Sequence, residues 1–253
     1  MNFLKHFRVY IDYSSGKIDF LPHNRIITKL DQHKSITLPL GISLASGYVP
    51  YIKCKINNKT QNCMLDTGAS SVLMIPFDAA DSQKSLKAEG QGSGGAFGLS
   101  NEVMLTRIDS LQLGSSQENA ILLKNQSATA TWEKYILGKG FLENYKIPYD
   151  FPGSKITLQS AGTSPTGYFS IGLGLMLDEK DNMIVRSVLI GSPAYGKIKP
   201  RDEIIEIGNL NATAKNLPLV YDLLTDDNSK IVKVKYRRDG KIHDIELEKA
   251  NLP

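Results

Sequence analysis

The chain of 253 residues is long enough for one large domain or two ordinary ones. Its apolar fraction of 41% argues against disorder, and 21 glycines among many short Val, Ile, Leu and Tyr runs favour mostly β structure. The net charge of +4 is dispersed, which does not indicate nucleic-acid binding, and the densest basic run, Lys233–Arg238, is expected to be a solvated strand face.

The sequence carries no membrane or metal signal. No apolar run approaches the ~18 residues of a transmembrane helix, and the N-terminus lacks the apolar core of a signal peptide. The four histidines are scattered, and with two cysteines no metal-ligand spacing appears. We therefore predict no membrane span in this chain, no metal and no cofactor.

The N-terminal segment is repeated later in the chain. Residues 3–13 match residues 141–151 without a gap, and the match continues from Lys17-Ile18 to Lys155-Ile156. Each copy predicts a short helix followed by two strands around a turn. The second copy closes a domain, so residues 1–24 are predicted to be the tail of an upstream lobe. A coincidental likeness, or an N-terminal piece that folds into a partner subunit, is the alternative.

A β-hairpin is predicted next, with strands at Tyr51–Ile56 and Gln61–Leu65. If Asn58 and Lys59 form a two-residue loop, Cys54 and Cys63 face each other across the strands. A disulfide in an oxidising compartment and two free buried thiols are then both open.

The most informative stretch is Met64-Leu65-Asp66-Thr67-Gly68-Ala69-Ser70. The apolar pair reads as the end of a buried strand that presents the Asp66 carboxylate at the floor of a cleft. Gly68 permits a tight turn and a close approach of another segment, and the Thr67 hydroxyl can bond to a partner loop. This is how aspartic proteases present a catalytic carboxylate.

One carboxylate is not enough for this chemistry. Two neighbouring carboxyls share one proton, so that one is the base that activates water and the other is the acid. The acids Asp78, Asp81 and Asp109 lack the following glycine. The second aspartate must therefore come from a second copy of the chain or from an upstream lobe, and the repeat favours the lobe.

A glycine-rich stretch follows, with Gly90, Gly92, Gly94, Gly95 and Gly98 within nine residues. Its Gly-x-Gly-x-x-Gly spacing matches the dinucleotide fingerprint, but no βαβ unit surrounds it, so that interpretation is rejected. The alternatives are a mobile hairpin that closes over substrate and a flexible surface loop without function.

Residues 25–160 resemble the retropepsin-like aspartic proteases of bacteria. Asp66-Thr67-Gly68 and the later Ile136-Leu137-Gly138 carry the resemblance. It implies that Asp66 is catalytic, held in place by Thr67 and Gly68, and that the Ile-Leu-Gly segment crosses beside the catalytic loop. It also implies that Gly92, Gly94, Gly95 and Phe97 belong to the flap and that the substrate is an extended polypeptide.

The C-terminal part begins after a linker at residues 161–166. Predicted strands lie at Ile184–Ile190, around Ile204-Ile205, and at Ile231–Tyr236 and Lys241–Leu247, the last two around Asp239-Gly240. A short helix is predicted to start at Gly191–Ala194, and another is predicted at Leu217–Leu224.

Residues 167–253 resemble a PDZ domain as found in bacterial proteases, a partly open β-barrel with one or two helices. Gly191-Ser-Pro-Ala194 and the segment from Gly196 to Ile205 carry the resemblance, which departs at Arg201, where the family usually has glycine. It implies that Ile171, Gly172 and Leu173 form a loop that captures a terminal carboxylate.

The combined prediction is a mainly β fold: a retropepsin-like acid protease lobe followed by a PDZ domain. The predicted function is an aspartic endopeptidase, of which this chain is the later lobe of a two-lobed or dimeric enzyme. The PDZ domain would bind polypeptide substrate or regulate access. A catalytically inactive peptide-binding protein is the alternative. The family resemblance places the full-length protein in the cell envelope, the periplasm or outside the cell.

Overall fold

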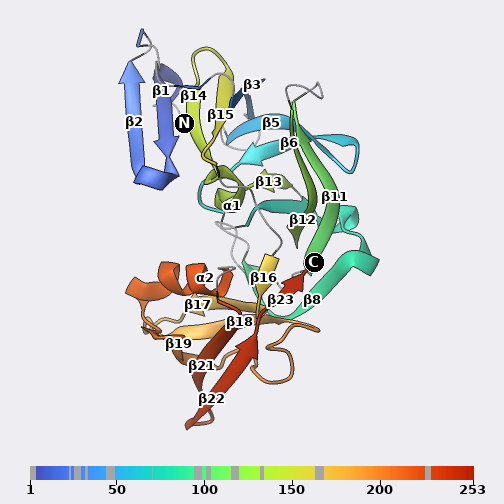
Figure 1. The fold of residues 1–253 in the computed structure, drawn as a ribbon, viewed down its shortest axis with the longest axis vertical. Coiled ribbons are helices and arrows are strands. Elements are labelled where there is room, and N and C mark those ends of the chain that lie inside the picture. Colours follow the sequence, from blue (N-terminus) through green and yellow to red (C-terminus); the bar gives the residue numbers. More distant parts are fainter. Residues whose placement is uncertain are drawn as a thin grey trace. The chain divides into compact units, whose positions relative to one another are not determined.

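The structure of the chain is a computed structural model (Figure 1). It describes residues 4–22, 24–25, 30–31, 34–43, 49–69, 71–93, 99–100, 104–114, 120–131, 134–162, 168–225 and 229–253. Strands dominate the described residues, and the α-helices there are α1 (Lys139–Leu142) and α2 (Leu217–Thr225), which confirms the mainly β class. In the described part of the chain, no helix is long and apolar enough to span a bilayer.

The chain divides into two compact units. One combines residues 1–79 with 108–166, and the other combines residues 80–107 with 167–253. The predicted protease domain was continuous from residue 25 to residue 160, whereas residues 80–107 group with the C-terminal residues. We describe the two units separately as the N-terminal unit and the C-terminal unit.

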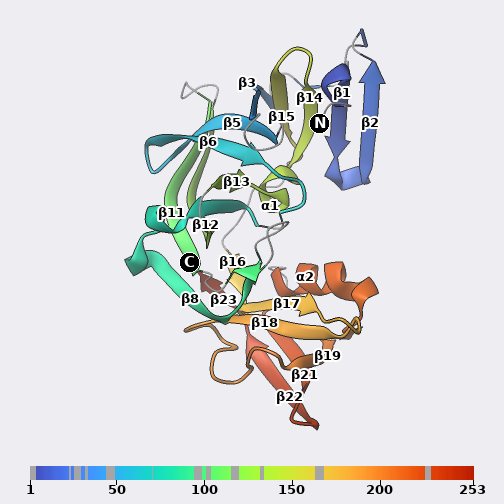
Figure 2. The same ribbon diagram turned by 180° about the vertical axis from the view of Figure 1, so that it is seen from behind.

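The N-terminal unit contains a sheet that closes on itself. Its strand order is β11-β12-β7-β13-β6-β5-β4, and β5 also pairs with β11 through Leu111–Leu113. Figure 2 labels β5, β6, β11, β12 and β13 of this sheet. The bounds are β4 (Gly41–Ser43), β5 (Val49–Ile56), β6 (Lys59–Leu65), β7 (Leu73–Pro76), β11 (Met104–Leu113), β12 (Ile121–Thr131) and β13 (Tyr135–Leu137).

The hairpin β5–β6 has a different register from the predicted one. Its loop is Asn57-Asn58, with φ of 46° and 67°, because the two-residue turns that fit twisted hairpins need positive φ at both positions and asparagine tolerates it. Cys54 therefore lies opposite Gln61, and Cys63 opposite Ile52. The cysteines are diagonal neighbours rather than directly opposite, and they form a disulfide with 6.0 Å between their Cα atoms.

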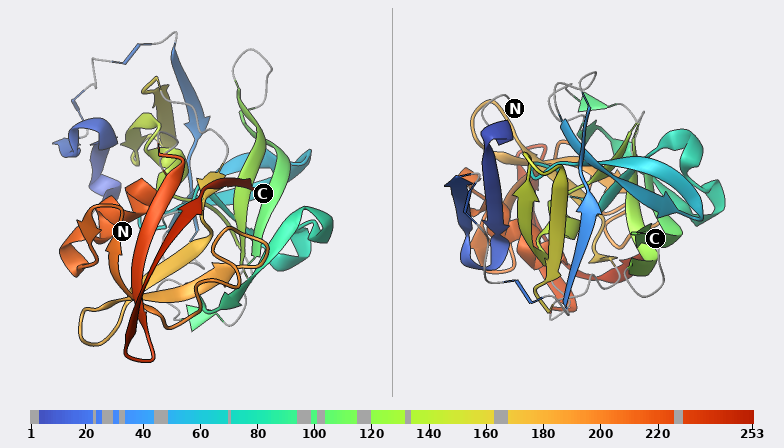
Figure 3. Two further views of the ribbon diagram at one scale, coloured as in Figure 1. Left: turned by 60° about the horizontal axis from the view of Figure 1, so that its bottom comes forward. Right: turned by 90° about the horizontal axis from the view of Figure 1, so that it is seen from above.

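The two sequence repeats supply four of the five strands of a second sheet in the N-terminal unit, of order β2-β1-β14-β15-β3, and the two copies meet where β1 pairs with β14. Figure 3 (right) shows the dark blue strands of the first copy beside the olive strands of the second. The strands span β1 (Phe7–Asp12), β2 (Lys17–Pro22), β3 (Ser35–Pro39), β14 (Tyr145–Asp150) and β15 (Lys155–Ser160). A short helix precedes each pair, η1 (Leu4–His6) in the first copy and α1 in the second.

The C-terminal unit is built on the strand order β22-β21-β19-β18-β8, with β17 also paired to β18. Its own core is formed by side chains such as Met183, Val220 and Val234. Its strands are β8 (Ser85–Gly90), β9 (Gly92–Ser93), β10 (Leu99–Ser100), β16 (Tyr168–Ser170), β17 (Leu173–Leu177), β18 (Met183–Leu189), β19 (Glu203–Ile207), β20 (Leu210–Asn211), β21 (Ile231–Arg238), β22 (Lys241–Glu248) and β23 (Ala250–Leu252).

Two local predictions for this unit are confirmed, and one is wrong. The hairpin around Asp239-Gly240 is present, with φ of 50° and 75° at the two loop residues, and the predicted helix at 217–224 is α2. The short helix expected from Gly191 is wrong, because residues 190–198 form consecutive turns. Pro193 lacks a backbone N–H, and Gly191 has φ of 82°, so neither residue supports a continuous helix there.

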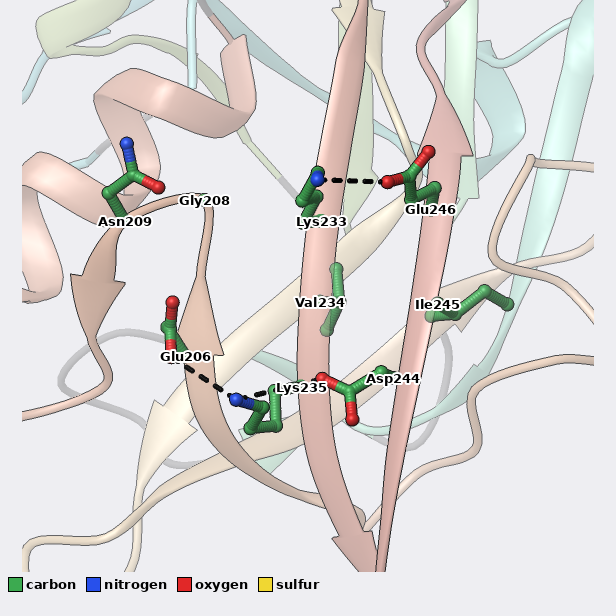
Figure 4. Close-up of a pocket in the computed structure, with 9 residues that line it drawn as sticks. All are labelled: Glu206, Gly208, Asn209, Lys233, Val234, Lys235, Asp244, Ile245 and Glu246. Carbon is green, nitrogen blue, oxygen red and sulfur yellow. Dashed lines mark ion pairs between the residues drawn. The ribbon is translucent and has the colours of Figure 1, made fainter.

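The basic run Lys233–Arg238 lies on a solvated strand face, as predicted. Lys233 pairs with Glu246 at 3.1 Å, and Lys235 lies 3.6 Å from Glu206 and 3.7 Å from Asp244. Figure 4 shows these side chains around a shallow depression on β19, β21 and β22. These ion pairs compensate the positive charges of Lys233 and Lys235 locally.

Candidate active site

The Asp66 loop begins where β6 ends. The Asp66 backbone N–H donates to the Leu137 carbonyl at 3.0 Å, and the Asp66 Oδ1 accepts the Gly68 N–H at 2.8 Å. The Ala69 N–H donates to the Asp66 carbonyl at 3.3 Å, which closes the turn. The Gly68 N–H thus holds one carboxylate oxygen, the other two bonds hold the backbone of the loop, and the Asp66 side chain is exposed.

Strand β13 supports this loop from the side. Strand β13 pairs in parallel with β6, where Leu137 lies opposite Leu65. It also pairs antiparallel with β7, where Leu137 lies opposite Leu73. The Gly138 N–H donates to the Val72 carbonyl at 3.2 Å. The crossing segment that the resemblance implied beside the catalytic loop is therefore Ile136–Gly138.

Gly138 is where this crossing is tightest. A Cβ at this position would lie 2.2 Å from the Ser71 carbonyl oxygen and 2.6 Å from the Ala69 carbonyl oxygen. The next residue, Lys139, donates its N–H to the Ala69 carbonyl at 2.6 Å. Because Gly138 has no side chain, β13 comes close enough to the Asp66 loop for hydrogen bonds on either side of Gly138. These bonds join the Asp66 N–H to the Leu137 carbonyl and the Lys139 N–H to the Ala69 carbonyl.

Tyr13 is a residue near the site that the sequence reasoning missed. Burial raises the pKa of Tyr13, and the negative charges of Glu143 and Asp66 raise that pKa further. Its hydroxyl is buried without a hydrogen-bond partner among the described residues. Tyr13 belongs to the first repeat copy, so this copy lies within electrostatic reach of Asp66. Its counterpart in the second copy is Phe151, and only that exchange of a hydroxyl-bearing ring hinted at a special position.

The flap prediction falls mostly outside the described residues. Gly94, Gly95 and Phe97 lie outside them, and Gly92 lies in β9, which pairs with β10 as a hairpin. The preceding strand β8 pairs with β18 of the C-terminal unit, with Glu89 opposite Val188. The structure therefore describes the base of the predicted flap but not its tip.

The predicted peptide-binding loop has a defined backbone. Ile171 and Leu173 are buried, and Gly172 has φ of 83°. The Gly172 N–H donates to the Ser170 hydroxyl at 3.1 Å, and the Ile171 carbonyl accepts the Ala194 N–H at 3.1 Å. The loop is thus held from behind by the Gly191–Ala194 segment, which the sequence had linked to the same domain.

Strand β17 faces helix α2 along one edge. The Tyr221 hydroxyl of α2 donates to the Leu175 carbonyl at 2.8 Å and accepts the Leu175 N–H at 3.3 Å. Because one hydroxyl serves both groups, the backbone edge of β17 at Leu175 points away from β18 and toward α2. At Leu175 both backbone groups of this edge are bonded to the Tyr221 hydroxyl.

The departure at Arg201 leaves the turn intact. Arg201 adopts φ of 74°, the left-handed conformation that the usual glycine would take, and donates its N–H to the Val185 carbonyl at 2.8 Å. Next to it, Asp202 is buried, accepts the Lys199 N–H at 2.7 Å and pairs with Arg238.

Two further aspartates of the N-terminal unit, Asp12 and Asp150, have structural partners of their own. Asp12 and Asp150 hold the turns of the two repeat copies, since Asp12 accepts the Ser14 N–H at 3.1 Å and Asp150 accepts the Gly153 N–H at 3.0 Å. Across the described residues, no group of three or more His, Cys, Asp or Glu side chains could hold a metal ion.

Comparison with known proteins identifies a related class. Residues 52–144 match the family described as gag-polyprotein putative aspartyl protease, a range that includes Asp66 and Gly138. This part of the chain thus resembles aspartyl proteases of the retropepsin type. No curated protein matches the chain.

Solved structures that are similar to the chain include two proteases. A retropepsin-like aspartic protease from Rickettsia conorii is 20% identical, with a TM-score of 0.35, over 50% of this chain and 90% of that chain. The HtrA-type protease AlgW with decapeptide is 9% identical, with a TM-score of 0.34, over 94% of this chain and 85% of that chain.

Proposed function

We propose that this chain is one lobe of an aspartic endopeptidase in which Asp66 supplies one of two catalytic carboxyls. The observation that carries the proposal is the exposed Asp66 carboxylate on a loop fixed by Leu137 and Gly138. The family match over residues 52–144 supports it. Thr67 and Gly68 would hold the loop, and the 90–98 segment would act as the flap.

The chemistry assigns a specific task to Asp66. In a pair of adjacent carboxyls that share one proton, the ionised one removes a proton from water, and the protonated one donates a proton to the scissile amide nitrogen. Water attacks the carbonyl carbon, and the C–N bond then breaks. Because the proton belongs to the pair, either carboxyl can take either part. The second carboxyl would come from a second aspartic lobe.

The C-terminal unit would bind polypeptide as a PDZ-like module. The loop at Ile171–Leu173 would meet a terminal carboxylate, and a peptide would add as a strand along β17. The Leu175 backbone edge, which faces α2 and whose N–H and carbonyl bond the Tyr221 hydroxyl rather than another strand, supports this part of the proposal. The same observation favours the second candidate function, a peptide-binding protein without protease activity.

The proposed compartment is oxidising: the cell envelope, the periplasm or the outside of a bacterial cell. Two neighbouring strands bear Cys54 and Cys63 close enough for the disulfide between them. Structural disulfides persist mainly in such compartments.

The Asp66→Asn variant tests the activity. We expect the natural gene product, expressed from its full coding sequence, to cleave an unfolded protein, and the variant to lose at least about a hundredfold in rate because a general acid–base group is removed. The matched control is Asp78→Asn, which neutralises another exposed carboxylate of the same unit and should change the rate little.

The same variant separates the two candidate functions. An unchanged cleavage rate in Asp66→Asn would contradict the protease assignment. If the unsubstituted protein cleaves nothing but binds peptides with a free C-terminus, and Asp66→Asn binds them equally well, the peptide-binding function is the correct one.

A further inference from the structure

The two repeat copies pair with each other about a local twofold axis. Strands β1 and β14 run antiparallel, and Tyr10 lies opposite Pro148, its own counterpart in the repeat. Arg8 lies opposite Asp150, and Asp12 lies opposite Lys146. Since Lys146 is the counterpart of Arg8 and Asp150 that of Asp12, the pairing is self-complementary, as at the interface of a symmetric dimer.

The ion pairs and turns obey the same symmetry. The Arg8 guanidinium lies 3.2 Å from the Asp150 carboxylate, and the Lys146 ammonium lies 3.4 Å from the Asp12 carboxylate. The two hairpin turns also agree, because Gly16 and its counterpart Ser154 both have positive φ, of 62° and 50°. The repeat seen in the sequence is therefore a repeated structure with conserved register.

The symmetry breaks at the apolar face of the sheet. In the second copy, Ile156 and Leu158 on β15 are 0% and 1% exposed. In the first copy, their counterparts on β2, Ile18 and Phe20, are 57% and 49% exposed. Phe20 retains an edge-on contact with Phe7 at 6.2 Å, but half of its surface is still open. Equivalent apolar positions are thus covered on one side of the axis and open on the other.

The edge of the sheet shows the same difference. Strand β15 is flanked by β3, with Ile156 opposite Leu38. Its counterpart β2 ends the strand order, so in the described part of the chain it is paired on one side only. An exposed apolar strand at a sheet edge is a surface for pairing with another segment.

We propose that the outer edge and apolar face of β2, at Ile18 and Phe20, form the docking surface for a second aspartic lobe that precedes residue 1 on the same polypeptide. This inference rests on the proposed function and names the partner of its site. The docked lobe presents a strand equivalent to β3 to the edge of β2 and places its core over Ile18 and Phe20. The register is that of β15 with β3, so the lobe residue equivalent to Leu38 lies opposite Ile18.

A second copy of this chain does not fit this place as well. In each copy, β3 is already paired with β15 of the same chain over five residue pairs, from Ser35–Gln159 to Pro39–Lys155. The strand of a docked lobe that is equivalent to β3 must therefore not be paired with a closing hairpin of that lobe. It can then pair with the hairpin of residues 7–22 instead. A lobe directly upstream of these residues meets that requirement, because the hairpin then follows it in the chain as residues 141–160 follow the second lobe.

Cysteine labelling tests the docking surface. The only two cysteines of the chain form a disulfide, so Ile18→Cys introduces a single free thiol in it. We would compare maleimide labelling at residue 18, located by mass spectrometry, in the 253-residue chain and in the C-terminally tagged product of the natural gene's full coding sequence. Phe20→Cys serves as a second variant. Ile242→Cys is the matched control, because Ile242 is also a strand isoleucine and is 57% exposed.

We expect residue 18 to react at least about tenfold more slowly in the natural product than in the 253-residue chain, and residue 242 to react equally in both. Equal reactivity of residue 18 in both would overturn the proposal. So would a natural product no larger than the 253-residue chain, or protection in a 253-residue chain that forms a dimer, which would identify a second copy as the occupant.

The labelling is independent of catalysis. A natural product that protects residue 18 but cleaves no protein would remove the proposed activity and leave the docking surface standing. An active natural product in which residue 18 stays reactive would do the reverse.

Discussion

At the scale of single residues, Gly138 decides how closely β13 approaches the Asp66 loop. A methyl group there would collide with two backbone carbonyl oxygens, of Ser71 and Ala69, which belong to the loop itself and have no flexible side chain to move aside. We expect Gly138→Ala to lower the free energy of unfolding by about 1–3 kcal/mol, the usual cost of overpacking. We also expect it to lower the cleavage rate by more than the loss of folded protein explains.

Urea unfolding of the 253-residue chain measures this cost. The matched control is Gly16→Ser, at a site with nothing within 4 Å of the added Cβ. The second repeat copy already carries Ser154 in the same left-handed conformation, so the control should cost about 1 kcal/mol or less. A Gly138→Ala variant as stable as this control would show that the loop adjusts to the methyl group.

At the scale of elements, strand β8 joins the predicted flap to the C-terminal sheet. The Ile190 N–H donates to the Lys87 carbonyl at 2.7 Å, and the Gln91 N–H donates to the Arg186 carbonyl at 3.0 Å. At Gly90 an added Cβ would lie 2.2 Å from the Arg186 carbonyl oxygen. We expect Gly90→Ala to weaken this pairing and to accelerate amide exchange at Ile190 and Gln91 by about tenfold, which corresponds to about 1.4 kcal/mol of local stability.

Hydrogen exchange read by NMR checks this expectation. Gly196→Ala is the matched control, because Gly196 also has positive φ, of 74°, but nothing lies within 4 Å of an added Cβ. Both variants carry the cost of a left-handed alanine, and only the first carries a collision with backbone. Equal exchange in the two variants would mean that β8 tolerates the substitution and that the contact does not fix the strand.

The sequence predicted elements whose signal is local. The Asp66 loop, the hairpin around Asp239-Gly240 and the repeat are all visible in short stretches, because turn residues and side-chain identities mark them directly. The predicted hairpin register, which placed Cys54 opposite Cys63, was wrong. The sequence did contain the correct signal, since the paired asparagines at 57 and 58 suit a two-residue turn better than Asn58-Lys59 does. The pairing of β8 with β18 joins residues about 100 positions apart, and one sequence contains no pattern that reports such a contact. The placement of Tyr13 near Asp66 was hidden for the same reason.

At the scale of the whole molecule, the C-terminal unit is built from two separate stretches of the chain. The C-terminal unit includes residues 80–107, which lie between two stretches of the N-terminal unit in the sequence. Removing residues 167–253 would therefore take away β18 and also the Leu252 carbonyl, which accepts a hydrogen bond from Arg107 at 2.6 Å.

A chain that ends at residue 166 should keep exchange protection in β5, β6 and β14 but lose it at Gln91. Its 80–107 segment should become a site of rapid proteolysis, because exposed segments that have lost their packing are cut first. The control is the full chain with a protease site inserted in the linker, cut after folding: both pieces are then present, and the segment should stay protected. Protection of residues 85–91 in the truncated chain equal to that in the cut control would show that β8 folds with the N-terminal unit.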